Sequence, residues 1–343
     1  MSKNIVMCSD GTWNHPDETQ GGHPAPTNVH KLFKALLVTA GQLPFYDDGV
    51  GADGTPIDRL LGGAIGDGLF QKIKHGYTKI AHVFVPGDQI YLFGFSRGAY
   101  TARSLAGMIA ICGLPDAAKL TDQAVEDAFE AYRSRTNRQP LLDALKAKYG
   151  NGIGGGAGAP NVEIAVVGVW DTVGALGIPG QVFAGVDDQI YGFLNTTLHP
   201  DVHAAYHALS IDERRSEFVP TLWDAPTAPG QVLEQVWFAG GHGDVGGGWA
   251  QTGLSDLTLG WMMTRARAKG LLIDEAVYAS YANLDPKHAL DQLHDAWTIL
   301  WGFPTLRTIP GNSVISGTVA TRLRFDPSYR PRNLPSGYPP PAP

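Results

Sequence analysis

The sequence predicts an α/β protein with a mostly parallel central sheet flanked by helices. Apolar runs rich in β-forming residues alternate along the chain with runs of helical period, which is the pattern of repeated strand–helix units. Four of the predicted strands end in polar residues, at Asp10, Ser96, Asp171 and His242. Because functional loops leave the carboxyl ends of parallel strands, we expect these four residues to meet at one edge of the sheet.

The composition argues against several classes of protein. With 43% hydrophobic and 17% charged residues, the chain of 343 residues is expected to fold around a substantial core. Its net charge of −7 and the lack of a basic run argue against nucleic acid as a partner. No apolar stretch approaches the roughly 18 residues that span a bilayer, and the chain does not open with a signal peptide. A cytoplasmic protein is expected, with export by a signal-independent system and peripheral contact with lipid left open.

The N-terminal half contains clear elements. The strand over 4–8 is expected to be central, because its residues do not alternate in polarity. Asn28 is predicted to cap a helix that runs to about residue 40 with one apolar face. The other predicted elements are a loop over 15–27, a strand over 43–46, a flexible stretch over 62–68, a helix over 69–85, a strand over 89–95 and a helix over 99–111.

The C-terminal half is less regular. Its predicted elements are one or two polar helices in 116–149, a glycine-rich loop over 151–160, a strand over 162–169, a short helix over 199–209, strands over 218–221 and 234–238, and a helix over 255–269 capped by Ser255 or Asp256. Beyond residue 274 the pattern weakens, and the proline-rich tail from 327 to 343 is expected to be irregular. A single domain is predicted over 1–326, with insertions at about 116–160 and 174–200. The stretches 174–198 and 52–70 are candidates for a lid.

The two cysteines carry little functional information. Cys8 and Cys112 each lie in an apolar segment, which predicts buried free thiols. Two cysteines without a Cys-x-x-Cys pair exclude a zinc ribbon or finger. No cofactor is expected from the sequence.

Ser96 is the best candidate for a nucleophile. It lies in the pattern Gly94-x-Ser96-x-Gly98, between a predicted strand and a predicted helix, which is typical of a nucleophile elbow. The tight turn would strain and expose the serine, and the two glycines would let strand and helix approach without Cβ clashes. Without that function, the same pattern would be an ordinary structural turn.

A serine nucleophile needs a base, and the base needs an orienting acid. His242 follows a late strand, as the order Ser…Asp…His requires; His199, His203 and His207 are rivals. Asp171 follows the strand after that of Ser96 and is predicted to orient His242. The alternative for Asp171 is a turn-capping role.

The remaining candidates lie beside these residues. Asp244 competes as the acid, although a role in ordering its glycine-rich loop is favoured. The backbone N–H of Arg97 is predicted to be one donor of an oxyanion hole, and that of Gly11 or Thr12 the second, with Asp10 ordering the turn.

Six motifs in order resemble the DUF2235 family of α/β-hydrolases, which includes phospholipase effectors of type VI secretion of the Tle1 type. They are Asp10-Gly11-Thr12-Trp13-Asn14, Gly49-Val50-Gly51, Gly94-Phe95-Ser96-Arg97-Gly98-Ala99, Trp170-Asp171-Thr172-Val173-Gly174, 209–215 and 237–248. The resemblance implies an α/β-hydrolase fold, a Ser96-Asp171-His242 triad and esterase or phospholipase chemistry. Two departures are the glycines on both sides of His242 and the lack of the large membrane-contacting region of those effectors, so an esterase is expected ahead of a phospholipase.

The leading functional hypothesis is a serine hydrolase that cleaves small or lipid carboxylic esters through an acyl-enzyme. A phospholipase A-type effector is the first alternative. A second is metal-dependent hydrolysis with Asp10, Asp171, His242 and Asp244 as ligands, although no metal-binding spacing supports it. A third is a catalytically silent interaction module. The sequence leaves the acyl length and the oligomeric state open.

Overall fold

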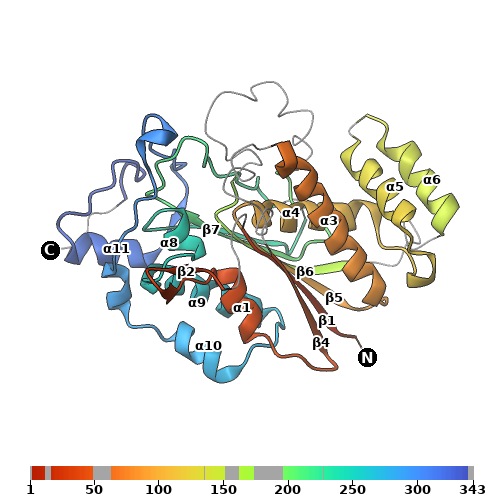
Figure 1. Ribbon diagram of the computed structural model, residues 1–343, viewed down its shortest axis with the longest axis horizontal. Helices are drawn as coiled ribbons and strands as arrows, with labels where there is room; N and C mark the ends of the chain where they lie inside the picture. The colour runs from red at the N-terminus through yellow and green to blue at the C-terminus, as the bar shows by residue number, and fades with distance from the viewer. Residues whose placement is uncertain are drawn as a thin grey trace.

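The protein is built on a twisted sheet of seven parallel strands in the order β4-β1-β5-β6-β7-β8-β9 (Figure 1). The computed structural model describes residues 2–11, 17–48, 63–134, 136–150, 162–173, 196–226 and 228–338. The strands are β1 (Asn4–Ser9), β4 (Gln42–Asp47), β5 (Gln89–Phe95), β6 (Glu163–Trp170), β7 (Ala204–Ser210), β8 (Val232–Phe238) and β9 (Val314–Ile315). The predicted α/β class with a mostly parallel sheet is confirmed.

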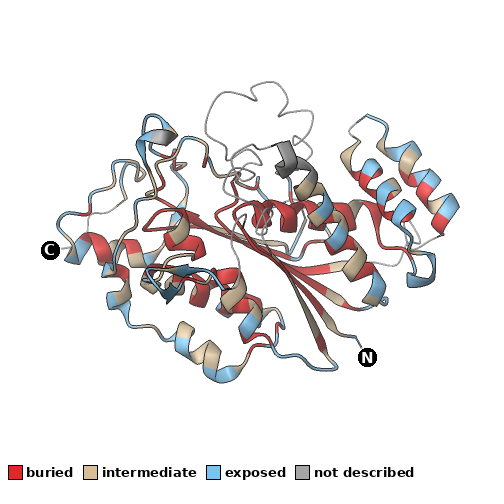
Figure 2. Cartoon of the chain, viewed as in Figure 1, coloured by how far each residue is buried: buried red, intermediate tan, exposed pale blue. Residues whose placement is uncertain are grey.

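Helices cover both faces of the sheet. One layer holds α3 (Gly63–Val83), α4 (Arg97–Cys112), α5 (Asp122–Arg133) and α6 (Arg138–Tyr149), and the other holds α1 (Asn28–Ala35), α9 (Gly253–Ala268) and α10 (Glu275–Ala282) (Figure 1). Successive residues of β1 point into opposite layers, Ile5 and Met7 toward the α4 side and Val6 and Cys8 toward the α9 side. Figure 2 shows the central strands buried along most of their length. This double burial explains why β1 reads as continuously apolar.

The other elements of the described residues lie mostly at the edges and in the C-terminal region. They are the small antiparallel pair β2 (Thr19–Gln20) and β3 (His23–Pro24), the short helix α8 (His242–Gly246), the helix α11 (Gly317–Phe325) and three 3₁₀ turns, η1 (Ala117–Lys119), η2 (Pro286–Leu290) and η3 (Ile299–Trp301). The described part of the tail, 327–338, contains no helix or strand, yet Tyr329 is buried in a third apolar cluster with α11. Cys8 and Cys112 are free and buried, as predicted. Within the described ranges, no helix is both long and apolar enough to cross a membrane.

Two predictions of secondary structure are wrong. The segment 199–209, predicted as a short helix, contains β7, which pairs with β6 and β8 and is buried at every residue. A strand covered on both faces lacks the alternation that marks a strand in sequence, so small and apolar residues there look helical. The segment 218–221, predicted as a strand, makes only an isolated bridge at Pro220, which has no N–H to continue a ladder.

Several element boundaries also differ from the prediction. Helix α1 ends at Ala35 rather than near residue 40, because the backbone of Leu36 forms a bridge with Ile273 instead. Its N-cap is Thr27, whose hydroxyl accepts the His30 N–H. Helix α3 already begins at Gly63, inside the stretch predicted to be flexible, and α9 is capped at Thr252. The loop 151–160 and most of the lid candidates lie outside the described residues.

Candidate functional site

The turn between β5 and α4 has the geometry of an elbow. Ser96 adopts φ 57° and ψ −122°, a conformation that costs a serine on the order of 1–3 kcal/mol. A Cβ on Gly94 would overlap the Gly98 carbonyl, and a Cβ on Gly98 would overlap the backbone of Ser9. The two glycines therefore allow the elbow to close and to pack against the end of β1. Ser96 is strained, as the sequence predicts, but buried rather than exposed.

Asp171 and His242 meet beside this elbow. Asp171 follows β6 with a positive φ of 43° and is fully buried. His242 begins α8, directly after the loop that leaves β8, and its Nδ1 lies 2.6 Å from Asp171 Oδ2. The imidazole ring packs at a tilt of 33° against Phe95, the residue before Ser96, with ring centroids 4.5 Å apart. Among the described residues the Ser96 hydroxyl has no hydrogen-bond partner, so the contact between His242 and the elbow runs through Phe95.

A buried arginine from the C-terminal region completes the surroundings of Asp171. The guanidinium of Arg307 binds both carboxylate oxygens, with Nη1–Oδ1 at 2.6 Å and Nη2–Oδ2 at 2.8 Å. The same two nitrogens donate to the carbonyls of Ser210 and Phe218. The Ser210 N–H donates to Asp171 Oδ1 at 3.0 Å. This paired, bidentate arrangement is what a buried carboxylate requires.

These contacts set the ionisation of the pair. Burial by itself would raise the pKa of Asp171, but the charge of Arg307 and the hydrogen bonds from His242 and Arg307 outweigh it and hold the pKa far below its usual range. An ionised carboxylate only accepts, so the proton of the imidazole lies on Nδ1 and Nε2 carries the lone pair. Burial lowers the pKa of His242, and Asp171 only partly offsets that effect. The imidazole is therefore neutral at pH 7.

Glu213 supports the backbone of the histidine. Its Oε2 accepts the N–H of His242 at 3.2 Å, while both oxygens bind the guanidinium of Arg215. Burial raises the pKa of Glu213, but the hydrogen bonds and charge of Arg215 prevail and bring it to about 2. The Arg215 guanidinium lies 3.5 Å from the centre of the Phe218 ring, and Phe218 meets the His242 ring edge-on at 4.9 Å. Charge and aromatic contacts thus fix the loop that carries His242.

The end of β1 lies next to the elbow but is held differently. Asp10 Oδ2 accepts the hydroxyls of Thr27 and Tyr46, each at 2.6 Å, and Oδ1 accepts the Gly11 N–H at 2.6 Å. Burial raises the pKa of Asp10 to about 6, although these hydrogen bonds lower it in part. Since the Gly11 N–H already has this partner, an oxyanion role for Gly11 requires that bond to open. Thr12 lies outside the described residues.

Arg97 is the first residue of α4 and directly follows Ser96, so its N–H lies in the first turn of the helix. This position at the mouth of the elbow is the one predicted for an oxyanion donor. Asp244 lies two residues after His242 but binds another histidine: its Oδ1 meets His294 Nδ1 at 2.6 Å, and its Oδ2 accepts the N–H groups of Gly241 and His294. Asp244 thus orders the loop rather than contacting the His242 ring.

The rival residues are placed elsewhere. His207 lies in β7, fully buried, and its Nε2 accepts the Thr172 N–H at 3.0 Å. His199 and His203 both precede β7, at the opposite end of that strand from Ser210. The four residues considered as metal ligands do not converge, since Asp10 and Asp244 each have separate partners. Within the described ranges, no group of three or more His, Cys, Asp or Glu could hold a metal ion.

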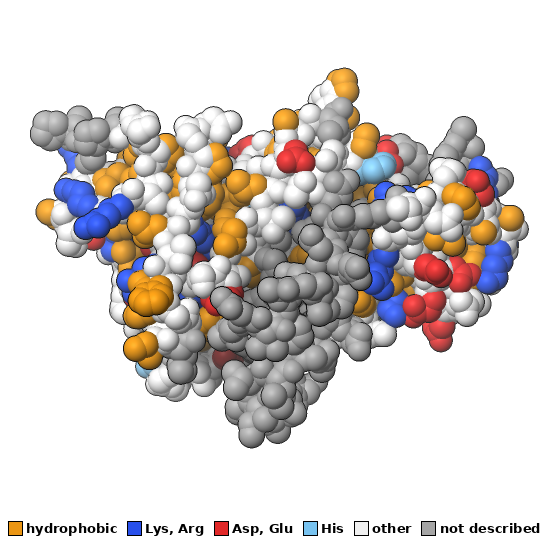
Figure 3. Space-filling model, turned by 90° about the horizontal axis from the view of Figure 1, so that it is seen from above, with side chains coloured by type: hydrophobic (Ala, Val, Ile, Leu, Met, Phe, Trp, Pro, Cys, Tyr) orange, Lys and Arg blue, Asp and Glu red, His pale blue; other side chains and the backbone are white. Residues whose placement is uncertain are grey.

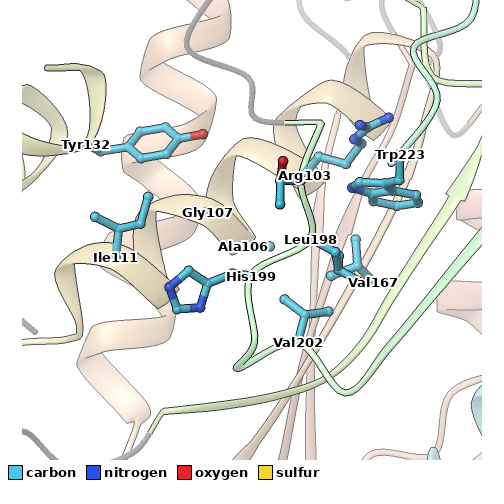
Figure 4. Close-up of a pocket in the computed structure, with 11 residues that line it drawn as sticks. Arg103, Ala106, Gly107, Ile111, Tyr132, Val167, Leu198, His199, Val202 and Trp223 are labelled. Carbon is cyan, nitrogen blue, oxygen red and sulfur yellow. The ribbon is translucent and has the colours of Figure 1, made fainter. Parts of the chain in front are cut away.

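A cavity of about 40 Å³ lies on the α4 side of the sheet, and Figure 4 shows the residues that line it. It is lined by Arg103, Ala106, Gly107, Ile111, Tyr132, Val167, Thr197, Leu198, His199, Val202 and Trp223. The aliphatic part of Arg103 lines it, while the guanidinium stacks on Trp223 and donates to the Thr221 carbonyl. The volume suits a few water molecules and is too small for an acyl ester. This cavity is therefore not the substrate site.

Sequence reasoning missed three residues of the site. Glu213 was part of a recognised motif, and two arginines directly after its carboxylate were a signal that it is paired. Arg307 and His294 lie in the region where the sequence pattern weakens. Their partners are 136 and 50 residues away, so no local spacing indicates them.

Comparisons with known proteins identify the family and relatives of this chain. The sequence model of the family described as "T6SS, Phospholipase effector Tle1-like, catalytic domain" matches residues 3–265. An uncharacterized protein of Saccharomyces cerevisiae is 30% identical over 236 residues, which cover 63% of this chain and 32% of the yeast protein. The chain thus spans about a third of the length of this curated relative.

Two solved structures are also similar. A crystal structure of an uncharacterized protein from Pseudomonas aeruginosa aligns with a TM-score of 0.48 and 18% identity, covering 84% of this chain and 48% of that chain. A structure of the Tle1 effector bound to the VgrG spike from the type 6 secretion system aligns with a TM-score of 0.40 and 17% identity, covering 72% and 51%.

Proposed function

The chain belongs to the family of Tle1-like catalytic domains of type VI secretion phospholipase effectors, and from this premise we propose that it is a serine hydrolase of carboxylic esters. The observation that carries the proposal is the contact between Asp171 and His242 Nδ1, 2.6 Å long, beside the strained Ser96. A neutral imidazole with its Nε2 lone pair free is the base that a serine nucleophile needs.

The proposed reaction has two steps. Ser96 Oγ attacks the carbonyl carbon of the ester, and its proton passes to His242 Nε2. The tetrahedral intermediate collapses, the alcohol leaves with that proton, and the acyl group stays on Ser96. Water then attacks the acyl-enzyme with His242 again as the base, which releases the carboxylic acid and restores the serine.

Asp171 orients the imidazole and stabilises the imidazolium that forms in each step. Arg307 keeps Asp171 ionised, and the Arg97 N–H at the start of α4 is a donor for the oxyanion. The strain at Ser96 supports the proposal, because unfavourable backbone conformations persist where the surrounding structure enforces them. The head group and acyl length of the substrate are not part of this proposal.

The test is hydrolysis of a soluble short-chain p-nitrophenyl ester. Ser96→Ala should lower kcat by roughly 10⁵- to 10⁶-fold, and a fluorophosphonate should label Ser96 in the unmodified protein. Ser104→Ala is the matched control, because Ser104 lies on the same helix but is buried away from the elbow; it should keep its activity. Turnover that survives Ser96→Ala would refute the serine mechanism.

A further inference from the structure

A loop near the proposed site carries large apolar side chains in solvent. Residues 296–306, called the apolar loop below, contain no charged residue. Ile299 is 84% exposed, Phe303 92% and Leu306 51%. Single exposed apolar residues are common on protein surfaces, but a cluster of large ones on a short loop marks an interaction site.

The apolar loop is held in its conformation by hydrogen bonds at its base and tip. The Trp301 N–H donates to the Thr298 carbonyl at 2.9 Å, which forms the single turn η3. The Thr305 N–H donates to the Arg214 carbonyl at 2.8 Å, and the Trp297 N–H donates to Asp295 at 3.0 Å. A loop that is already ordered pays little conformational entropy on binding, so its exposed side chains are ready for a partner.

The apolar loop adjoins the proposed catalytic residues. Trp301 packs edge-on against Phe218 with ring centroids 5.6 Å apart, and Phe218 packs against His242. At the other end of the loop, Arg307 binds Asp171. Figure 1 shows η3 in blue on the upper side, toward which the carboxyl ends of the strands point. Figure 3 views that side and shows hydrophobic side chains gathered in its left part, the part of the molecule where η3 lies in Figure 1.

The order of side chains in the loop matches a lipid–water boundary. The aliphatic and aromatic residues are at the exposed tip, and half-buried Trp297 and Trp301 lie behind them. The guanidinium of Arg214 lies over Trp297 at 5.3 Å, and that of Arg215 over Trp301 at 5.2 Å. An apolar tip followed by tryptophan is the order met on passing from the acyl chains to the interface, and both guanidinium groups are ion-paired, Arg214 with Asp295 and Arg215 with Glu213.

We propose that the apolar loop docks the protein on a lipid bilayer and so brings the ester to Ser96. This inference rests on the proposed function. It commits to lipid because Trp301 of the loop packs on Phe218, which packs on the proposed base His242, and the substrate must arrive beside that residue. Since the loop has no charge and the chain carries a net charge of −7, docking depends on apolar insertion and not on anionic lipid.

The binding test measures sedimentation of the full chain with phosphatidylcholine vesicles. The chain carries Ser96→Ala, so that the vesicles are not hydrolysed during the assay. We expect co-sedimentation that persists at 1 M salt, because apolar insertion is not screened. The double substitution Ile299→Ser and Phe303→Ser should weaken partitioning about a hundredfold, or about tenfold for each side chain removed.

The matched control is Phe325→Ser, which removes a 60% exposed phenylalanine at the end of α11, outside the apolar loop. It should leave partitioning unchanged. Absence of vesicle binding by the parent protein would overturn the proposal, as would equal binding of the double variant. So would a change in sedimentation velocity that shows the loop to be an interface between two copies.

A second measurement separates docking from catalysis. With Ser96 intact, the double variant should hydrolyse the soluble p-nitrophenyl ester at the parental rate. Its hydrolysis rate on vesicles of the same lipid should fall at least about tenfold. Retained activity on the soluble ester also shows that the variant is folded. If the parent cleaves no ester but binds vesicles through the loop, the proposed function fails and the docking proposal stands. Equal losses of hydrolysis rate by the double variant on both substrates would overturn the docking proposal.

Discussion

Two aspartates are buried at the carboxyl ends of strands in the same sheet, yet their surroundings shift their pKa values in opposite directions. Asp10, after β1, is held by the neutral hydroxyls of Thr27 and Tyr46, and its pKa is raised to about 6. Asp171, after β6, is held by Arg307 and His242, and its pKa is far below the usual range. Burial is common to both, so the difference comes from the charge of the partners.

The comparison separates two uses of a buried carboxylate. Asp171 stays ionised throughout the range in which an imidazole titrates, as a residue that orients His242 must. Asp10 gains and loses its proton near pH 6 and shapes the turn that precedes residues 12–16.

The first prediction compares the same substitution at both positions. Asp171→Asn should lower kcat on a soluble ester by roughly 10⁴-fold, because an amide favours the wrong tautomer of His242. Asp10→Asn should lower it by less than about tenfold, since Asp10 does not touch the imidazole. Initial rates of ester hydrolysis by both variants at pH 8 measure the two losses. Similar losses would mean that the two carboxylates do not have distinct roles.

The second prediction removes the charge that distinguishes Asp171. Arg307→Met leaves a buried carboxylate without its main partner and should lower the free energy of unfolding by about 3–5 kcal/mol in urea titrations. The negative charge of Asp171 would then act on the imidazolium unopposed, so the acid limb of the kcat/KM profile should move to higher pH. Arg307→Lys keeps the charge and should preserve that limb. An unshifted profile for Arg307→Met would confine Arg307 to a structural role.

The third prediction concerns stability against pH. Because the pKa of Asp10 is raised, the native state holds a proton between about pH 4 and pH 6 that the unfolded chain releases. Stability contributed by Asp10 is therefore full below about pH 4 and falls by about 3 kcal/mol as pH rises through 6. Asp212, whose pKa burial also raises to about 6, adds a slope of the same sign.

Urea unfolding at pH 4, 5 and 6 measures this slope. Asp10→Asn should remove the contribution of Asp10 to the slope of unfolding free energy against pH. The contribution of Asp212 should remain. Asp171 and Glu213 have lowered pKa values, so their contribution has the opposite sign and is lost as pH falls toward 2. An identical slope in the variant would show that the surroundings of Asp10 do not raise its pKa.

The sequence predicted those parts of the protein whose signals are local. The elbow at Ser96 was recognised because its glycines, strand and helix are adjacent in sequence. Strand β7 was missed because burial on both faces removes the periodicity that reveals strands. The N-cap at Thr27 was displaced by one residue because the neighbouring Asn28 is an equally good cap, and in the fold Asn28 instead donates to the Val245 and Ser255 carbonyls.

The surroundings of the proposed catalytic residues were beyond sequence reasoning for a different reason. Aspartates at strand ends could be found from the alternation of elements, and two of them were singled out. Their ionisation depends on partners that the tertiary fold supplies, such as Tyr46 for Asp10 and Arg307 for Asp171. Only the tertiary structure shows that the partner of one aspartate is a hydroxyl and that of the other a guanidinium.

The distance along the chain between Asp171 and Arg307 bears on the timing of synthesis. Arg307 is made 136 residues after the aspartate that it neutralises, a delay of roughly 7 to 30 seconds at the speed of a ribosome. During that interval the nascent chain already contains Ser96 and Asp171 and then His242, but not the cation that holds the carboxylate in its ionised form. The ion pair that holds Asp171 ionised can therefore form only after residue 307 has left the ribosome.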